Sequence, residues 1–193
     1  SSWTIVSVGQ NAIAGITQNN QLYMWGNPSQ TPFADGSTVI RSSPVQIGTS
    51  SWSQVAAGTR HSLAIKSNST LWSWGNNVAG ETGNSNIFLT DNSSPVQIGT
   101  SSWSLVSAGK SFSLAKTVDN KLFAWGDGKY GEIPNPYIAT VPISWVSSVS
   151  TTTNGLGAHF KQSDGTLWIW GRNTEGELGF LATSFNRSSP VQL

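Results

Sequence analysis

The chain of 193 residues contains no cysteine, which excludes a disulfide framework and any metal site built on thiolates. No apolar run approaches the ~18 consecutive residues that a membrane-spanning helix requires, so we expect no membrane span. Charged residues make up 10% of the sequence, against ~25% in typical soluble domains. The net charge is +1 and the basic residues are scattered singly. This disfavours a nucleic-acid partner, because binding to the phosphate backbone needs clustered Lys and Arg.

The polarity of the chain comes instead from Ser, Thr, Asn and Gln, together with 20 glycines and ten tryptophans. Low charge with many Trp is unlike the composition of disordered chains. No segment shows sustained helical periodicity, so little helix is expected. The length suits one medium domain, and the composition favours a turn-rich β protein. There is no initiator Met and no signal-type segment, so we expect a chain that was processed or excised from a longer protein.

Internal repetition is the strongest feature of the sequence, since residues 42–52 and 93–103 both read SSPVQIGTSSW. A Leu-aromatic-x-Trp-Gly stretch occurs at Leu22–Gly26, Leu71–Gly75, Leu122–Gly126 and Leu167–Gly171. A Trp followed six residues later by Gly occurs at Trp3–Gly9, Trp52–Gly58 and Trp103–Gly109, and Trp145–Thr151 matches it with Thr in place of Gly. The landmarks predict one domain over residues 1–193 with four repeats, at approximately 1–49, 50–100, 101–144 and 145–193.

Each repeat reads as four short strands with tight turns between them. In the second repeat the strands are expected near 52–58, 61–65, 71–75 and 95–98. Turn-forming pairs that tolerate positive φ recur before the third strand, at Asn19-Asn20, Asn68-Ser69, Asp119-Asn120 and Asp164-Gly165. Four antiparallel strands per repeat predict an all-β fold of four β-propeller blades, either as a closed four-blade ring or as part of a larger ring or assembly.

The repeated tryptophans are expected to fill the core between neighbouring blades, because a blade within a ring is covered on both faces. We favour this interpretation over a stacking platform for sugars or bases. The residues concerned are Trp3, Trp25, Trp52, Trp74, Trp103, Trp125, Trp145 and Trp170.

Residues 43–83 and 161–179 resemble repeats of the regulator of chromosome condensation family, and the resemblance extends over essentially the whole chain. It implies a β-propeller, which in this family usually has seven blades. The repeat serves chromatin binding and nucleotide exchange on a small GTPase in the eukaryotic namesake. It serves β-lactamase inhibition in a secreted bacterial protein, and it occurs in bacterial and phage surface proteins. Few charges and near-perfect tandem copies resemble the surface members more, so we expect an extracellular, cell-surface or virion location.

The sequence contains no motif that supports a catalytic or cofactor site. Residues 126–131 match GxGxxG, but the following EIPNP cannot open the helix that a dinucleotide site requires. His61 and His159 have no second ligand at metal-binding spacing, and no nucleophile elbow, catalytic triad or Walker loop is present. Glu81, Glu132 and Glu177 recur once per repeat, which favours capping of loop amides over acid–base work. We therefore expect a non-enzymatic chain with no cofactor and no metal.

The loops after the first strand of each repeat stand in a repeated framework, but the residues within them vary between polar, basic and aromatic types. Such variation on a fixed scaffold is typical of a binding face. Neutral drift in exposed loops explains the variation equally well. A protein partner, or neighbouring chains or domains of its own, is the favoured ligand. A carbohydrate-binding, adhesin-like module using exposed aromatic residues such as Phe112 and Tyr130 is the alternative, and a chromatin or GTPase partner is disfavoured by charge. The candidate residues are Gln10, Asn11, Arg60, His61, Lys110, Phe112 and Asn154.

The outer repeats look like internal ones, since Trp3 and Val191 stand at ordinary repeat positions and Leu193 stands where the second repeat has Ile98. Terminal repeats of an open array normally carry a polar outer face. We therefore expect the end faces to be covered. The fourth blade would close on the first, or the faces would meet a neighbouring chain or another part of a longer polypeptide.

Overall fold

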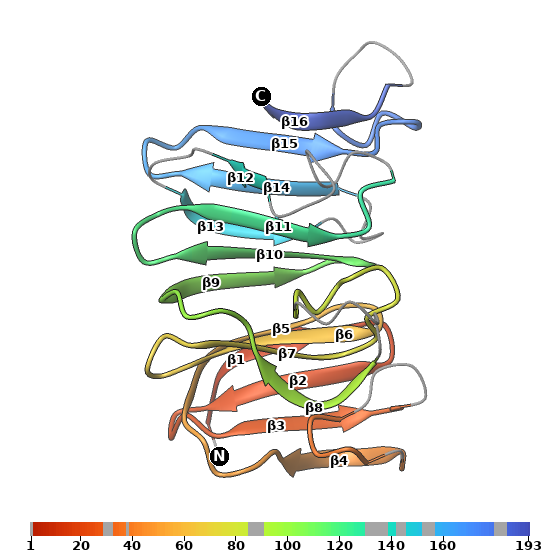
Figure 1. Cartoon of the computed structure of the whole chain (residues 1–193), viewed down its shortest axis with the longest axis vertical. Helices are drawn as coiled ribbons and strands as arrows, with labels where there is room; N and C mark the ends of the chain where they lie inside the picture. The colour runs from red at the N-terminus through yellow and green to blue at the C-terminus, as the bar shows by residue number, and fades with distance from the viewer. Residues whose placement is uncertain are drawn as a thin grey trace.

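The computed structural model describes residues 2–28, 33–37, 39–84, 91–129, 139–141, 146–151, 157–179 and 185–193. These residues form four sheets of four strands (Figure 1). Blade 1 contains β1 (Trp3–Val8), β2 (Ala12–Thr17), β3 (Leu22–Gly26) and β4 (Arg41–Gln46). Blade 2 contains β5 (Trp52–Ala57), β6 (His61–Lys66), β7 (Leu71–Gly75) and β8 (Asn92–Gln97).

Blade 3 contains β9 (Trp103–Ala108), β10 (Phe112–Thr117), β11 (Leu122–Gly126) and β12 (Ala139–Val141). Blade 4 contains β13 (Val146–Thr151), β14 (Gly157–Gln162), β15 (Leu167–Gly171) and β16 (Arg187–Gln192). In every blade the strands pair antiparallel in chain order, which confirms the predicted all-β fold of four-stranded blades. Within the described ranges there is no helix of the length and hydrophobicity needed to cross a membrane.

The tight turns between the second and third strands confirm the hairpin prediction. Asn20, Ser69 and Asn120 have φ values of 60°, 65° and 66°, and Gly165 has 92°. Asn tolerates this left-handed region because its short polar side chain forms local hydrogen bonds, and Gly because it has no Cβ. The turn-forming residues are thus placed where the chain reverses.

Neighbouring blades pack front to back. The front face of a blade carries its repeat tryptophans, such as Trp52 and Trp74, and contacts the preceding blade. The back face carries the first Leu of the third strand, such as Leu71, and contacts the following blade. Three hydrophobic clusters result, one at each junction between successive blades.

The expected core role of the tryptophans holds where a preceding blade covers them. Trp52, Trp74, Trp103, Trp125 and Trp170 are buried. On the uncovered front of blade 1, Trp3 is exposed and Trp25 is half-buried, and Trp145 lies outside the described residues.

The register of blade 4 corrects one sequence alignment. Val146 pairs with Gln162, as Trp103 pairs with Thr117 in blade 3. Val146, and not Trp145, therefore occupies the tryptophan position of this repeat. The sequence alignment was shifted because the link between β13 and β14 spans 152–156, against 109–111 in blade 3, and counting residues from the Trp-Gly stretch cannot locate such an insertion.

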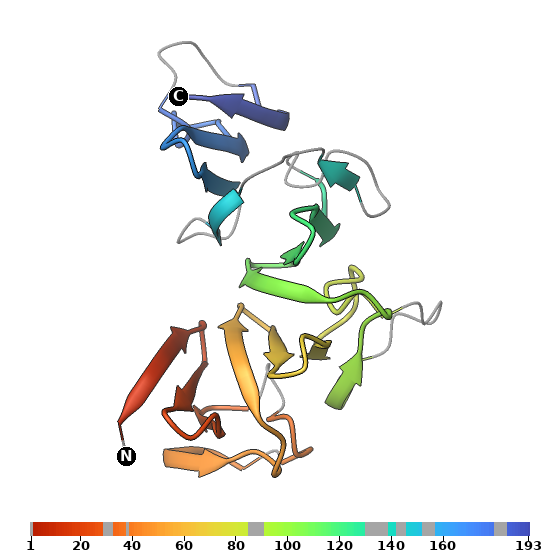
Figure 2. The same cartoon turned by 90° about the vertical axis from the view of Figure 1, so that its left-hand side faces the viewer.

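The four blades follow one another along a curved row, with blade 1 and blade 4 at its two ends (Figure 2). Each first strand packs on the first two strands of the preceding blade, as β5 does on β1 and β2. None of the larger strand contacts among the described residues joins blade 1 to blade 4. What covers the two end faces therefore stays a prediction.

Candidate functional site

The turns between the first and second strands of blades 1 to 3 lie at one edge of the row. We call this surface, residues 9–11, 58–60 and 109–111, the loop face. In Figure 1 the turn between β9 and β10 lies at the right, whereas the hairpins that join β10 to β11 and β14 to β15 lie at the left. The fold thus separates these turns from the tight hairpins.

The backbone of the loop face is the same in each of the three blades. Gly9, Gly58 and Gly109 each donate an N–H to the carbonyl three residues later, at 2.9, 2.8 and 2.9 Å. A second hydrogen bond joins each turn to the end of the third strand. The residue that follows this strand donates its N–H to the carbonyl of Asn11, Arg60 or Ser111, at 2.7, 2.8 and 2.7 Å. A fixed framework therefore presents different side chains.

The glycines also let the three turns touch one another. A Cβ on Gly9 would clash with the carbonyl oxygen of Gly58, and a Cβ on Gly58 would lie 2.6 Å from that of Gly109. Thr59 donates its N–H to the same oxygen of Gly109 at 3.2 Å. A side chain at either glycine would separate the blades, so its absence makes the three turns one continuous surface.

Four of the predicted binding residues lie on this surface. Gln10, Arg60 and Lys110 are exposed and Asn11 is half-buried. Gln10 and Lys110 directly follow the turn glycine, and Asn11 and Arg60 are the second residue after it, so each of the three turns presents at least one amide or cation. Asn154 lies outside the described residues.

His61 and Phe112 do not lie on the loop face, although the sequence grouped them with it. They begin β6 and β10 and turn toward the following blade, where they are 0% and 1% exposed. Strand alternation explains the difference, because the first strand residue after each turn points to the back face. The structure places both in the core between blades.

A polar junction beneath the loop face joins blades 2 and 3. The Oγ atom of Ser113 donates its hydrogen to the Glu81 carbonyl at 2.7 Å and lies 2.8 Å from Nε2 of His61. Since a hydroxyl has one hydrogen, Nε2 of His61 carries the proton and donates it to Ser113. Trp125 Nε1 also donates to the Glu81 carbonyl, at 2.8 Å. Burial lowers the pKa of His61 to about 4, so the ring is neutral at pH 7.

The recurrent glutamates cap their loops, as predicted. The Oε2 atom of Glu81 accepts the N–H of Ala79 at 2.9 Å, and Oε2 of Glu177 accepts that of Glu175 at 2.8 Å. Burial raises the pKa of Glu81. Glu132 lies outside the described residues.

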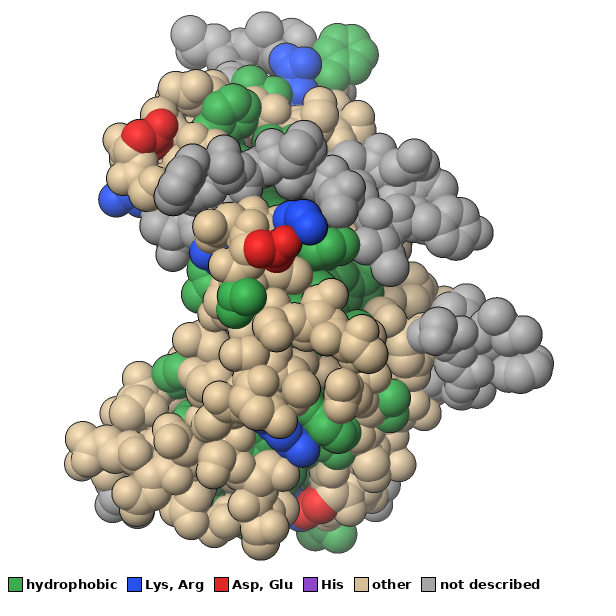
Figure 3. Space-filling view, turned by 60° about the vertical axis from the view of Figure 1, so that its left-hand side comes forward, with side chains coloured by type: hydrophobic (Ala, Val, Ile, Leu, Met, Phe, Trp, Pro, Cys, Tyr) green, Lys and Arg blue, Asp and Glu red, His purple; other side chains and the backbone are tan. Residues whose placement is uncertain are grey.

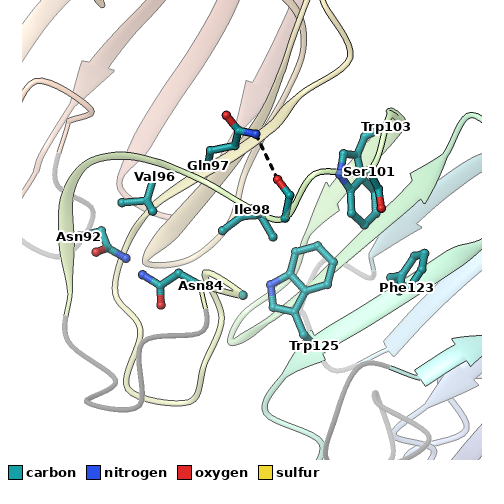
Figure 4. Close-up of a pocket in the computed structure, with 11 residues that line it drawn as sticks. Asn84, Asn92, Val96, Gln97, Ile98, Ser101, Trp103, Phe123 and Trp125 are labelled. Carbon is teal, nitrogen blue, oxygen red and sulfur yellow. Dashed lines mark hydrogen bonds between the residues drawn. The ribbon is translucent and has the colours of Figure 1, made fainter.

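A groove of about 700 Å³ lies between the outer strand of blade 2 and blade 3. Trp103, Phe123 and Trp125 form one side and Asn84, Asn92 and Gln97 lie on the other (Figure 4). Trp103 and Trp125 are almost fully buried, and Trp125 already uses its N–H. The described residues that line the groove include no acid, base or nucleophile pair, and they offer packing surfaces and amide hydrogen bonds.

Charged side chains are sparse on the face shown in Figure 3, where Lys, Arg, Asp and Glu stand in small groups among uncharged atoms. Within the ranges that the structure describes, three or more His, Asp or Glu side chains do not gather as they would around a metal ion.

The regulator of chromosome condensation (RCC1) repeat model matches residues 52–81 and 103–132, which begin with β5 and β9. No curated protein sequence matches the chain significantly. Among solved structures, human WBSCR16 is 21% identical with a TM-score of 0.85, covering 98% of this chain and 52% of its own. Prp20p from Saccharomyces cerevisiae, whose structure was described with its binding to Gsp1p and histones, is 17% identical with a TM-score of 0.83, covering 99% and 50%.

The ectodomain of the Physcomitrella patens receptor kinase CR4 is a more distant match, 18% identical with a TM-score of 0.59, covering 93% of this chain and 45% of its own. The chain thus spans about half the length of the solved structures it matches. Identities this low establish the shared fold alone. Residues 52–81 and 103–132 thus match the regulator of chromosome condensation repeat, and the chain as a whole shares the β-propeller fold of these solved structures.

Proposed function

We propose that the chain is a non-enzymatic protein-interaction module that binds its partner through the loop face. The observation that carries this proposal is the pair of backbone hydrogen bonds shared by three contacting turns, which display Gln10, Arg60 and Lys110 to solvent. Binding surfaces combine a rigid scaffold with variable exposed side chains in this way. The inter-blade junction at Ser113 supports the scaffold, because it ties two of the turns together from below.

The proposed setting is a secreted, cell-surface or virion protein. The low share of charged residues and the near-identical tandem segments at 42–52 and 93–103 support it. Detection of the full-length protein in the medium, on the cell surface or in purified particles would test the setting. Its recovery in the cytosol alone would contradict it.

Partners like those of Prp20p, a small GTPase or histones, are the second candidate. Their support is the shared fold, whereas the net charge of +1 weighs against histone-like or nucleic-acid surfaces that rely on charge. The glycan alternative has less support. Of the two aromatic residues that carried it, Phe112 is buried and Tyr130 lies outside the described residues.

Affinity capture from an extract of the source organism tests the loop face directly. The bait is the immobilised chain, compared with a Lys110→Ala variant and a Lys121→Ala control. Both lysines are exposed and belong to blade 3, but Lys121 stands at the tight hairpin that joins β10 to β11, away from the loop face. We expect a specific partner to be retained by Lys121→Ala and reduced several-fold by Lys110→Ala. Equal loss in both variants would contradict a loop-face site.

Purified Gsp1p and core histones serve as defined probes in the same assay. Saturable binding of either one that is lost in Lys110→Ala would favour the second candidate.

A further inference from the structure

The front face of blade 1 is an apolar surface without a cover among the described residues. Trp3, Val6 and Val8 on it are 39%, 54% and 70% exposed. Their counterparts in blade 2, Trp52, Val55 and Ala57, are 3%, 5% and 7% exposed because blade 1 covers them. The two faces have the same construction and differ in whether another blade lies against them.

The aromatic side chains on this face are already ordered. The Trp3 ring lies 5.5 Å from Tyr23, edge to face, and 5.7 Å from Trp25. A contiguous apolar patch of this kind on a protein surface indicates an interaction site.

The back face of blade 4 is the complementary uncovered surface. Leu167 on it is 37% exposed, whereas Leu22, Leu71 and Leu122 at the same position are each 0% exposed beneath the next blade. Leu193 donates its N–H to Leu167 at 2.9 Å, as Ile98 does to Leu71 at 2.8 Å. Leu193 is 53% exposed and Ile98 is 9% exposed.

The polar residues on this back face have parallels at a covered junction. Lys161 stands at the position of Lys116 in blade 3, which lies at the junction with blade 4 and donates to Asn120 at 3.0 Å. His159 stands where blade 3 has Leu114, but His61 shows that a buried histidine is accommodated between blades. A following blade can therefore pack on this face.

We propose that two copies of the chain close head to tail into an eight-blade ring. In this ring the front face of blade 1 in each copy packs on the back face of blade 4 in the other. The same front-to-back contact already occurs at each of the three junctions within the chain.

The shape of the arc fits this arrangement. The chain superposes on about half of solved propellers, covering 52% of WBSCR16 and 50% of Prp20p. Two arcs related by a two-fold axis make a closed ring, and propellers of up to eight blades are common. Closing eight blades rather than seven changes the mean angle between neighbours from ~51° to ~45°, a small adjustment at each junction. Both apolar end faces are buried in the ring.

The test is the native mass of the full chain by sedimentation velocity at 5–50 µM, a typical working range of about tenfold. We expect a dimer of about 41 kDa, twice the chain mass of 20.5 kDa. Val8→Asp buries a charge at each contact and is expected to give a monomer of unchanged circular dichroism. Val78→Asp is the matched control, since Val78 is 67% exposed in the link between β7 and β8, and it should remain a dimer.

Leu167→Asp distinguishes head-to-tail from front-to-front pairing. In the ring this substitution places a charge on the back face of blade 4, which is the second surface in each contact between the copies. It too should therefore give a monomer. An equimolar mixture of Val8→Asp and Leu167→Asp keeps one intact contact and should recover part of the dimer. A wild-type monomer throughout this range, a dimer that survives Leu167→Asp, or open polymers larger than a dimer would each overturn the proposal.

Discussion

The Nε2 atom of His61 in blade 2 lies 2.8 Å from the Oγ atom of Ser113 in blade 3, inside a junction where both residues are fully buried. The contact makes the packing of two blades depend on the protonation state of one ring. In the described residues, Nδ1 of His61 has no hydrogen-bond partner, so a second proton would be buried without compensation.

Acid should weaken this junction. The folded pKa of His61, about 4, lies below its ordinary value of 6.5, so the stabilisation is complete above pH 6.5 and is lost as the pH falls toward 4. Between pH 7.5 and pH 5 we expect a loss of about 2 kcal/mol in the free energy of unfolding, measured with urea. Glu81 works in the opposite direction, because its raised pKa favours the folded state as the pH falls.

His61→Phe is the control for this pH effect, since blade 3 has Phe112 at the same position. It leaves Glu81 in place and should remove most of the difference between the two pH values. An equal pH response in the variant and the wild type would show that His61 does not control the junction.

We expect that the fold tolerates no side chain at Gly75 without a large loss of stability. Its φ is 105°, and a Cβ there would lie 2.5 Å from the carbonyl oxygen of Arg60, which helps to hold the loop face. Gly75→Ala should therefore cost about 2 kcal/mol or more in unfolding free energy. Gly165→Asn should be nearly neutral, because its site is open and Asn20 adopts positive φ in the matching turn. The urea midpoints of the two variants give the comparison, and similar losses in both would contradict the geometry.

Substitution of two equivalent leucines by Ala should lower the free energy of unfolding by different amounts, because one lies under a following blade and the other does not. Leu71 lies under blade 3, and Leu71→Ala should cost about 2–5 kcal/mol through lost contacts and a cavity. Leu167→Ala should cost less than about 1 kcal/mol in a Val8→Asp background, where the back of blade 4 stays uncovered. Calorimetry of the double variants measures both, and equal costs would mean that the two back faces are packed alike.

Local features of the fold were predictable from the sequence. Asn20 and Gly165 mark hairpins because positive φ is a property of single residues, and Glu81 caps its own loop within a few positions. Features that depend on contact with a neighbouring blade could not be predicted from the sequence. His61 follows a loop in the sequence, and only its orientation toward blade 3 makes it a core residue.

The register of blade 4 shows the same limit, because Trp145 fits the sequence pattern while the pairing with Gln162 belongs to Val146. The curvature of the row is set by small angles at each junction, which no short motif encodes. The end faces therefore looked ordinary in sequence, and their exposure emerged from the arrangement of whole blades.

Hydrogen exchange of the chain with and without its captured partner tests the central claim most directly, because it maps the contact on the protein itself. We expect slowed exchange at residues 9–11, 58–60 and 109–111, with the hairpins at 18–20, 67–69 and 118–120 unchanged. Slowed exchange at those hairpins, with the loop face unaffected, would contradict it.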